Sequence, residues 1–405
     1  MSLKIRSSVL VPLFIMVALI GFSGGLVTGA STRATNSGVW PALVAGLHLG
    51  SDPSLPVLNK VWTSIHSSFV QTNVDDQKLV QGAIAGLVSG LGDPYSVYFT
   101  PSEAKSFSQE ISGTFDGIGM ELGYKNNQLT VIAPLPGSPA EKAGISSGDV
   151  LLKIDQRDAT VMKLDEAIGF IRGPKGTIVV LTIQRAQEEK PRVVSVTRQT
   201  ISVPSVTTKM LTNGTAKIAD LKISSFNNDT GDSFLRLVQQ DLAQHPAGWV
   251  IDLRNNPGGY LDQAVIVASA FIRSGTIVSE IGRDGQRRNL EAKGDHVLAD
   301  AHMVALVDQG SASASEILAG ALQDTGRATI IGTKTFGKGS VQEYQELADG
   351  SSLKLTVAKW YTPKGRSISD AGVTPDLVVE RTPDDVAHDR DPQLDKALAQ
   401  LARQP

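Results

Sequence analysis

An apolar strand leads directly into a helix at residues 306–322, which read LVDQGSASASEILAGAL. Small residues fill the junction, and they let another backbone approach closely. A serine at such a junction lies beside the free N–H groups and positive dipole end of the helix, which favour a developing oxyanion. Three serines compete for this role, Ser311, Ser313 and Ser315. A simpler interpretation makes Ser313 and Glu316 a capping box, and both interpretations can hold together.

Strands and helices alternate on both sides of this junction, from residue 201 onward. Strands are expected at 216–223, 248–253, 303–308 and 328–331, helices at 229–243, 260–273 and 313–324, and a β-rich return through 353–361. This alternation predicts βαβ units and a largely parallel sheet, which is an α/β core. An amphipathic helix is expected at 392–403, with Leu394, Leu398 and Leu401 on one face, as a cap or a contact with a partner subunit.

Residues 113–200 have a different character and predict a small β-rich domain. Short β-type runs occupy 118–122, 129–132, 150–154, 177–183 and 192–197, and two short helices are expected at 139–143 and 164–171. Upstream, apolar spacing predicts two helices between Pro56 and Leu91, with Gly90 and Gly92 closing the second, and another helix at 101–111.

A nucleophilic serine needs a base, and the sequence offers a lysine rather than a histidine. His302 precedes the strand and is expected at its wrong end. Lys338 lies in GTKTFGKGSVQ, residues 332–342. Burial among apolar groups lowers the pKa of a lysine, and lowering it from about 10.4 by roughly 3 costs about 4 kcal/mol. The alternative is a solvated loop lysine.

Two further motifs near Lys338 point elsewhere. Residues 332–338 match the start of a phosphate-binding loop, but Gly339 stands where a Ser or Thr should hold magnesium, which disfavours a nucleotide site. Ser351 and Lys354 copy the S-x-x-K of penicillin-recognising enzymes. They lie on an alternating strand, where residues three apart point to opposite faces, so they are not expected to cooperate.

The small domain carries a second set of motifs. Its first β-type run begins Gly117-Ile118-Gly119-Met120, and consecutive N–H groups in such a loop can hold a carboxylate while the strand edge accepts a peptide. SPAEKAGI at 138–145 and GDVLLKI at 148–154 follow. In this order the motifs resemble a PDZ domain of bacterial proteases, which implies binding of C-termini. The peptide-binding residues would then be Gly117, Ile118, Gly119, Met120, Glu121 and Leu122. A generic β-barrel with turn glycines is the alternative.

Together with DLRNNPGG at 252–259, TFGKGSVQ at 335–342, YTPKGRSI at 361–368 and GVTPD at 372–376, the serine motif resembles the carboxyl-terminal processing, or tail-specific, proteases. The likeness runs from about residue 57 to 380. It implies a crotonase/Clp-like α/β protease core with an inserted PDZ domain and an N-terminal helical segment. It also implies Ser313 as nucleophile, Lys338 as base and Gln342, one helical turn beyond, orienting the lysine.

The glycines of DLRNNPGG let backbone N–H groups face a substrate. Gly258 or Gly259 is therefore expected to join the N–H of Ala314 as the oxyanion hole, unless the motif is only a tight turn between strand and helix. Arg172, in IRGPKG, could signal from the PDZ-like domain to the protease, and a surface arginine is the equal alternative.

Composition excludes several classes of protein. The chain has 405 residues, a net charge of −3 and no cysteine, so strong attraction to nucleic acid, disulfides and thiolate sites are not expected. Its six histidines form no zinc motif, and no metal or cofactor is expected. Lys4 and Arg6 precede an apolar run from Val9 to Val27, which is the layout of an export signal or signal anchor. The expected location is therefore exported, periplasmic or attached to the cytoplasmic membrane.

The expected organisation follows from these segments. It is a signal segment at 1–30, a linker at 31–55, the helical part of the core at 56–112, the PDZ domain at 113–200, the protease domain at 201–380 and a tail helix at 381–405. The expected function is a serine endopeptidase acting near C-termini of exposed or unfolded protein substrates through an acyl-enzyme. A non-catalytic peptide-binding protein of the same fold is the alternative, a homo-oligomer is left open, and no nucleic acid partner is expected.

Overall fold

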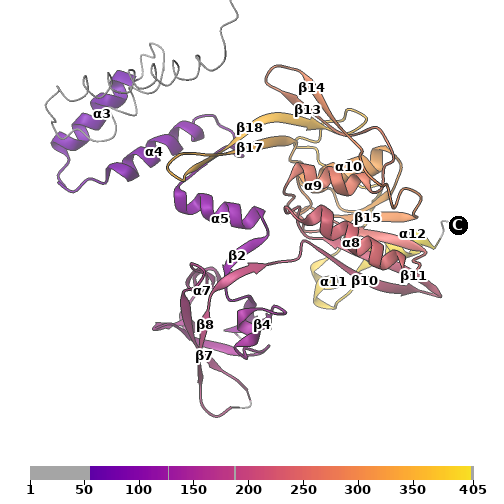
Figure 1. Cartoon of the computed structure of the whole chain (residues 1–405), viewed down its shortest axis with the longest axis horizontal. Helices are drawn as coiled ribbons and strands as arrows, with labels where there is room; N and C mark the ends of the chain where they lie inside the picture. The colour runs from indigo at the N-terminus through magenta and orange to yellow at the C-terminus, as the bar shows by residue number, and fades with distance from the viewer. Residues whose placement is uncertain (1–54, 126, 187, 403–405) are drawn as a thin grey trace, which may run out of the picture. The chain divides into compact units, whose positions relative to one another are not determined.

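The computed structural model describes residues 55–125, 127–186 and 188–402 (Figure 1). The expected membrane segment at 1–30 and almost all of the 31–55 linker lie outside these residues. No helix in the described part of the chain is long and apolar enough to cross a bilayer. The described residues fall into two compact units, the first ending at Ile84 and the second beginning at Ala85.

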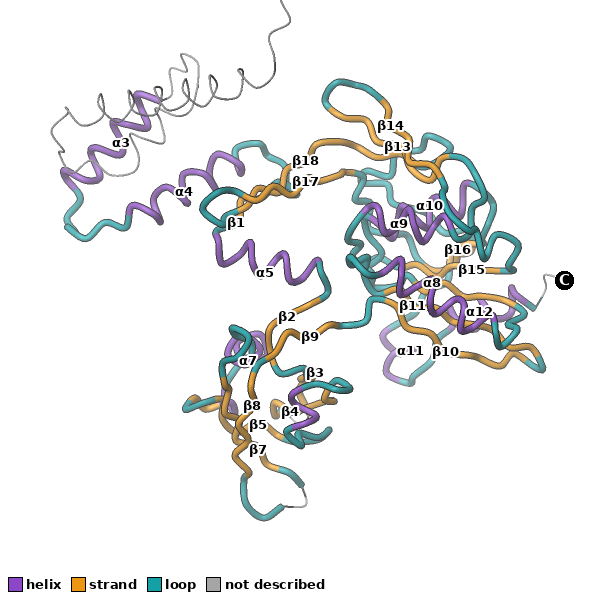
Figure 2. Tube along the Cα trace, in the orientation of Figure 1, coloured by secondary structure: helices purple, strands orange, loops and turns teal. Residues whose placement is uncertain are grey.

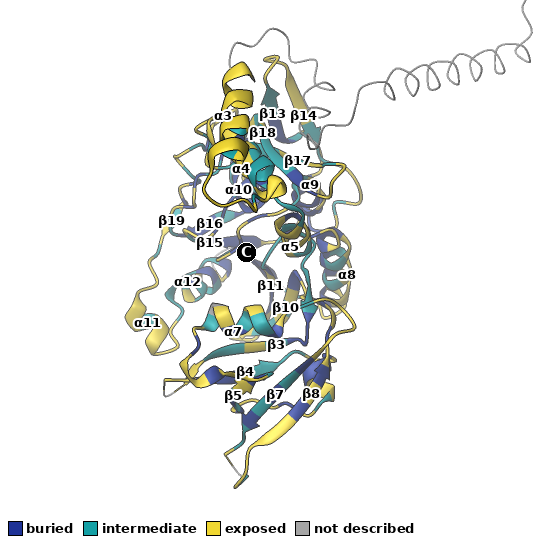
Figure 3. Ribbon diagram, turned by 90° about the vertical axis from the view of Figure 1, so that its left-hand side faces the viewer, coloured by how far each residue is buried: buried dark blue, intermediate teal, exposed yellow. Residues whose placement is uncertain are grey.

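The first unit contains the two helices expected upstream, α3 (Leu55–Ser68) and most of α4 (Asp76–Ser89). α3 is mainly exposed, as its yellow colour in Figure 3 shows, and Val57 and Val61 are half or more exposed. In the second unit, β1 (Val97–Phe99) is followed by α5 (Pro101–Ile111), whose bounds match the predicted helix.

A small β-domain, residues 114–202, follows α5. The antiparallel pair β2 (Thr114–Gly117) and β9 (Gln199–Ser202) joins it to the core. Its sheet has the order β3-β4-β5-β7-β8, with β6 paired to β5. The other elements are β3 (Met120–Lys125), β4 (Gln128–Pro134), α6 (Pro139–Lys142), β5 (Val150–Ile154), β6 (Arg157–Asp158), η1 (Ala159–Val161), α7 (Leu164–Ile171), β7 (Ile178–Gln184) and β8 (Arg192–Thr197). The domain encloses its own apolar core, which includes Val131, Leu151 and Leu181.

The largest core is built on a six-stranded sheet of order β10-β11-β12-β15-β16-β19. Pairing is parallel from β11 to β19 and antiparallel between β10 and β11, so the predicted parallel sheet is confirmed. The strands are β10 (Val206–Asn213), β11 (Ala216–Ile223), β12 (Gly248–Asp252), β15 (Met303–Val307), β16 (Thr329–Gly332) and β19 (Leu377–Val378). Figure 2 shows β11, β15 and β16 of this sheet close to the helices α8, α9 and α10.

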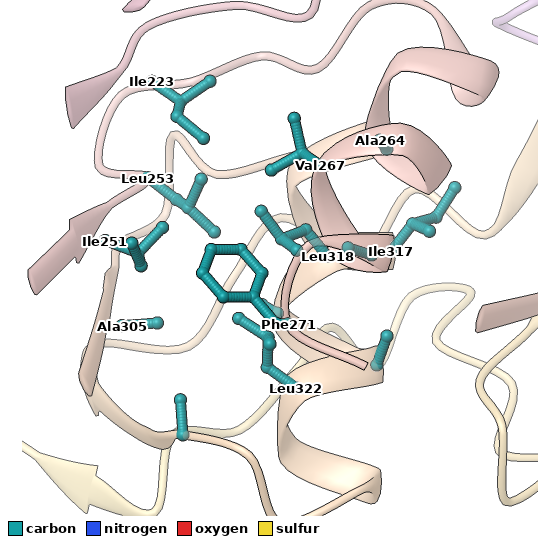
Figure 4. Close-up of a cluster of buried hydrophobic side chains, with 14 of the residues drawn as sticks. Ile223, Ile251, Leu253, Ala264, Val267, Phe271, Ala305, Ile317, Leu318 and Leu322 are labelled. Atoms are coloured by element: carbon teal, nitrogen blue, oxygen red, sulfur yellow. The ribbon is translucent and has the colours of Figure 1, made fainter. Parts of the chain in front are cut away.

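Helices cover both faces of this sheet, because side chains alternate along each buried strand. Trp249 and Ile251 of β12 face the cluster formed with α8 (Thr230–Leu242), α9 (Leu261–Ser269) and α10 (Ala314–Asp324). Figure 4 shows Phe271 there, among Leu253, Leu318 and Leu322. Val250 faces the other side, against α12 (Pro392–Leu401). The tail helix therefore covers this face of the sheet as a cap, which is one of the two roles expected for it. The short α11 (Pro383–Ala387) precedes it.

A second sheet, antiparallel and not expected in this form, completes the core. Its path is β1-β18-β13-β14, and β17 also pairs with β18. The strands are β13 (Thr276–Gly282), β14 (Arg287–Glu291), β17 (Ser340–Glu346) and β18 (Ser352–Tyr361). β18 pairs with β1 near its start and with β13 near its end. It also pairs with β17, which begins two residues after Lys338.

Candidate active site

Three loops meet at the carboxyl edge of the parallel sheet, where ligands of α/β sheets usually bind. The loop after β15 carries Ser313, the loop after β12 carries the two glycines of DLRNNPGG, and the loop after β16 carries Lys338. The three loops and β17 line a cavity of about 350 Å³ that includes Ser313, Lys338 and Gln342. The topology thus brings together residues that lie far apart in the sequence, from Phe107 to Trp360.

Ser313 differs from its two neighbouring serines in environment. Ser311 and Ser315 are fully buried, and their hydroxyls donate to the carbonyls of Leu253 and Asn256, both at 2.8 Å. Ser313 is half-buried, lines the cavity and immediately precedes α10. Its φ of 54° and ψ of −114° are strained for a residue other than glycine, a conformation typical of nucleophiles on sharp strand-to-helix turns. Of the three candidates, this geometry favours Ser313.

Glu316 connects the serine loop to the lysine loop. Its side chain is fully buried. One oxygen, Oε2, accepts the N–H groups of Ser313 and Lys338, both at 2.9 Å. The other, Oε1, accepts the N–H of Gly337 at 2.7 Å and the hydroxyl of Thr335 at 2.5 Å. The sequence predicted only a capping box here. The carboxylate does bind the N-cap N–H, but it also fixes the backbone of the candidate base.

The side chain of Lys338 lies in a largely apolar setting. Burial lowers the pKa of its ammonium below the usual lysine value, and the positive charge of Lys354 lowers it further, against the opposing effect of Glu316 and Asp93. Its Nζ lies 5.3 Å from the ring centroid of Tyr95. Trp360 donates its indole N–H to the carbonyl of Lys338 at 2.9 Å. A lysine with a lowered pKa in a cavity is suited to act as a base.

Gln342 lies on strand β17, so the expectation that it lies one helical turn beyond Lys338 is wrong. A register shift in the β17–β18 pair falls between Val341 and Gln342. The amide Nε2 of Gln342 donates to Ser340 at 2.8 Å and to Thr356 at 3.1 Å, so neighbours on the two strands hold it. Gln342 lines the cavity together with Lys338, and its orienting role stays a prediction.

The DLRNNPGG loop is fastened to the serine loop through Asn256. This fully buried residue accepts the N–H of Ala312 at 2.9 Å on its carbonyl. Its side-chain oxygen accepts the N–H of Gly258, also at 2.9 Å. The Gly258 N–H is therefore occupied. Among the residues that the structure describes, the N–H groups of Gly259 and Ala314 have no hydrogen-bond partner, which leaves these two as the candidate oxyanion donors.

Gly258 is required where it lies because the two loops nearly touch. A Cβ there would be 2.7 Å from the carbonyl oxygen of Ala312 and 2.8 Å from the Cβ of Ser313, and its φ is 101°. Only glycine fits such a position without displacing Ser313.

Aromatic residues and a second lysine complete the cavity. Phe107 of α5, Tyr344 of β17 and Lys354 of β18 line it. Phe107 stacks on Phe99 with ring centroids 4.6 Å apart and lies 5.5 Å from the ring of Tyr344. Neither α5 nor Tyr95 had been predicted to contribute to the site. They precede Ser313 by more than two hundred residues, and only the fold brings them near.

The alternative motifs are not supported by the geometry. In the phosphate-loop match, the N–H groups of Gly337 and Lys338 bind Glu316 and are not free for a phosphate. Ser351 is buried, and its hydroxyl donates to Asp349. His302 precedes β15, at the opposite end of the strand from Ser313, as expected. No group of three or more metal-ligating side chains occurs within the described residues.

In the β-domain, the predicted peptide-binding residues do not form one strand. Gly117 is the last residue of β2. Ile118 and Gly119 lie between the two strands, and Met120, Glu121 and Leu122 are the first residues of β3. Ile118 is 1% exposed and its side chain belongs to the domain's core, so only its backbone is left to contact a peptide, and its place in the groove stays a prediction. β3 is an edge strand of its sheet. The N–H groups of Ile118 and Gly119 have no hydrogen-bond partner in the described part of the chain.

Only glycine fits at position 119, because its φ is 72° and because a Cβ would lie 2.6 Å from the Cβ of Ser138.

Arg172 follows the last residue of α7 and is exposed, and its guanidinium lies 4.8 Å from the ring centroid of Phe115 on β2. It is thus a surface arginine that contacts the strand joining α5 to the β-domain. Its signalling role stays a prediction.

Comparisons with known proteins identify the family. The model of peptidase family S41 matches residues 217–379, the PDZ domain matches 130–185, and the "Activating protease CtpB N-terminal domain" matches 46–102. A carboxy-terminal-processing protease of Bartonella bacilliformis is 40% identical over 79% of this chain and 74% of that protein. The chain belongs to the S41 carboxy-terminal-processing proteases. It is a serine-type peptidase with a PDZ domain.

Other relatives of this S41 chain agree. The carboxy-terminal processing protease CtpA of Bacillus subtilis is 38% identical over 81% of this chain and 70% of that protein. The solved photosystem II D1 C-terminal processing protease is 28% identical, with a TM-score of 0.50, over 81% of this chain and 94% of that one. An S41 protease structure from Bacteroides fragilis, 15% identical with a TM-score of 0.56, covers 84% of this chain and 96% of that one and shares the fold.

Proposed function

We propose that this protease cleaves peptide bonds near protein C-termini with Ser313 as nucleophile and Lys338 as general base. The observation that carries the proposal is that both residues line one cavity and that the carboxylate of Glu316 binds the backbone N–H of each. Gln342 lines the same cavity and would orient the lysine. The lowered pKa of Lys338 increases the share of its neutral amine, which is the form that accepts a proton.

In the proposed reaction, the Lys338 amine accepts the proton of the Ser313 hydroxyl while its oxygen attacks the scissile carbonyl carbon. The N–H groups of Gly259 and Ala314 bind the oxyanion that forms. The C–N bond then breaks, and the Lys338 ammonium protonates the departing amine. Lys338 next accepts a proton from water, whose oxygen attacks the ester. Collapse of this second intermediate releases the acid and returns the proton to Ser313.

The β-domain is proposed to recruit the substrate's tail. β3 offers a free strand edge, and the unpartnered N–H groups of Ile118 and Gly119 precede it. An added peptide strand ending in a carboxylate would satisfy both features. Export is proposed from the apolar run Val9–Val27 that follows Lys4 and Arg6. Cell fractionation checks that part, since a purely cytosolic enzyme would contradict it.

The test of the dyad compares the full chain with Ser313→Ala and Lys338→Ala on an unstructured protein substrate. Both variants should lose turnover by at least about 1000-fold, because neither nucleophile nor base can be replaced by alanine. Lys359→Met, an exposed lysine on β18, is the matched control and should keep activity. Wild-type turnover in either dyad variant would show that the dyad is assigned wrongly. EDTA should leave the rate unchanged.

A further inference from the structure

Lys354 is a cationic side chain in the active-site cavity for which the proposed chemistry has no use. It lies near the start of β18, opposite Val97 of β1 and Tyr344 of β17. It is half-buried, and it lines the same cavity as Ser313 and Lys338. A lysine in that place lies within reach of a bound peptide.

The Lys354 ammonium is held by aromatic rings and not by a counter-ion. Its Nζ lies 4.9 Å from the ring centroid of Phe107 and 5.6 Å from that of Phe99. It forms no ion pair and no side-chain hydrogen bond with any residue that the structure describes. Rings restrain an ammonium but do not neutralise it, so this half-buried charge can still bind an anion.

The acidic side chains nearby form no ion pair with the Lys354 ammonium. Burial lowers the pKa of the Lys354 ammonium, and the negative charges of Glu110 and Asp93 oppose this lowering through space. The Asp93 carboxylate already accepts the Ser96 hydroxyl at 2.6 Å and the Tyr95 N–H at 3.1 Å. Glu110 also acts through space and lines the cavity, without an ion pair to Lys354. Since Lys338 must be neutral to act as a base, Lys354 provides the remaining positive charge among the lining residues.

We infer that Lys354 binds a carboxylate of the substrate while the scissile bond lies at Ser313, so that the cavity itself selects peptides with an acid near the cleavage point. This inference rests on the proposed function. The carboxylate has two sources, the free C-terminus of the chain being processed or an Asp or Glu side chain. Lys354 is then a specificity residue, separate from any selection by the β-domain.

The experiment uses the full chain and three matched peptides that differ only beyond the scissile bond: a free C-terminal acid, the same peptide as an amide, and the amide with one internal Glu. The readout is the ratio of kcat/KM for acid to amide within each variant. Any effect of Lys354 on the ionisation of Lys338 cancels in this ratio, because one enzyme cleaves both peptides. Wild type should prefer a carboxylate by about 10- to 100-fold, the usual effect of a charged hydrogen bond.

Lys354→Met keeps an apolar side chain and should bring the acid-to-amide ratio of kcat/KM close to one. Lys354→Arg keeps the charge and should keep most of the preference for the acid. Glu110→Gln, which removes a competing negative charge, should raise the ratio. Thermal unfolding of each variant checks the fold, and Lys359→Met should change nothing. Preference for the internal Glu peptide alone would assign the side chain as source, and preference for the terminal acid alone would assign the C-terminus.

The inference is wrong if the preference for acid survives in Lys354→Met, or if wild type has none. It is also wrong if Lys354→Met slows acid and amide equally. These results are distinct from failure of the proposed function, because that failure would appear as activity remaining in Ser313→Ala on all three peptides.

Discussion

The carboxylate of Glu316 accepts the backbone N–H of Lys338 at 2.9 Å, and it does so with the same oxygen that accepts the N–H of Ser313. One buried side chain therefore fixes the spacing between the candidate nucleophile and the candidate base. Neither residue can shift along its loop without breaking a hydrogen bond to a charged group, which costs about 1.5–3 kcal/mol.

Replacement of Glu316 by glutamine is expected to uncouple the two loops. Glutamine keeps the shape, but its NH₂ group faces N–H donors where an oxygen accepted them. Because a displacement of about 1 Å at a reacting group costs roughly 100-fold, kcat/KM should fall by about that factor. Loss of about 3 kcal/mol of stability should lower Tm by about 6–12 °C. The exposed Glu346→Gln is the control, and full activity in Glu316→Gln would exclude the coupling role.

The pH dependence of stability should reveal the burial of Lys338. Its pKa is lowered in the folded protein, chiefly by burial, so the unfolded chain binds more protons between that lowered pKa and the usual lysine value. Stability from this group therefore rises with pH across that window and is poorest below it. Lys338→Met should be inactive yet more stable than wild type at neutral pH. The gain should shrink at higher pH, and Lys359→Met should show no such change. A Tm difference that is the same at all pH values would contradict this.

Activity should follow the same ionisation. In the proposed reaction the neutral amine is the base, so kcat/KM should rise with pH and level off above the pKa of Lys338, which lies below the usual value for lysine. Measurements across neutral and alkaline pH check this expectation. A rate that keeps rising to the normal pKa of lysine would indicate that burial does not tune the base.

Tyr95 is expected to act through its ring. The centroid lies 5.3 Å from the Nζ of Lys338, a distance at which a cation–π contact is worth about 0.5–2 kcal/mol. Tyr95→Phe should keep activity within about twofold, while Tyr95→Ala should lower kcat/KM about 3- to 30-fold. Equal losses in both variants would assign the effect to the hydroxyl instead.

Gly258→Ala should impair activity strongly, although Gly258 contributes no side chain. The new Cβ would press on the carbonyl of Ala312 and the Cβ of Ser313, at 2.7 and 2.8 Å. The nucleophile should be displaced, with a loss of about 100-fold or more in kcat/KM. Gly82→Ala in α4, where nothing lies within 4 Å of the added carbon, is the matched control. Retained activity in Gly258→Ala would show that the loops can separate.

Local patterns predicted much of the fold. The bounds of β5, β8, β11, α5 and α7 match the predicted ranges, because each has a clear apolar period. The antiparallel sheet was not predicted as a unit, because its pairs join distant segments, as Tyr98 with Leu353 and Glu280 with Trp360 show. Composition of a strand does not reveal its distant partner.

The candidate site was predictable where its residues share a motif and not where the fold brings them together. Motifs together with the family resemblance indicate Ser313 and Lys338, and their roles stay predictions. Glu316 was assigned only half its role, because Thr335 and its neighbours are about 20 positions away. Lys354 was considered only as a partner for Ser351, which the strand geometry excludes, and its place in the cavity depends on the pairing of β17, β18 and β1.

The positive φ of Ser313 has a consequence for how this enzyme would respond to selection. A non-glycine residue at φ 54° and ψ −114° holds about 1–3 kcal/mol of strain that glycine would not. A laboratory evolution experiment that rewards heat resistance alone should therefore enrich Ser313→Gly, a more stable protein that has lost the proposed nucleophile. Selection for both heat resistance and activity would retain the serine. The residue found at position 313 would therefore show whether activity was selected together with stability.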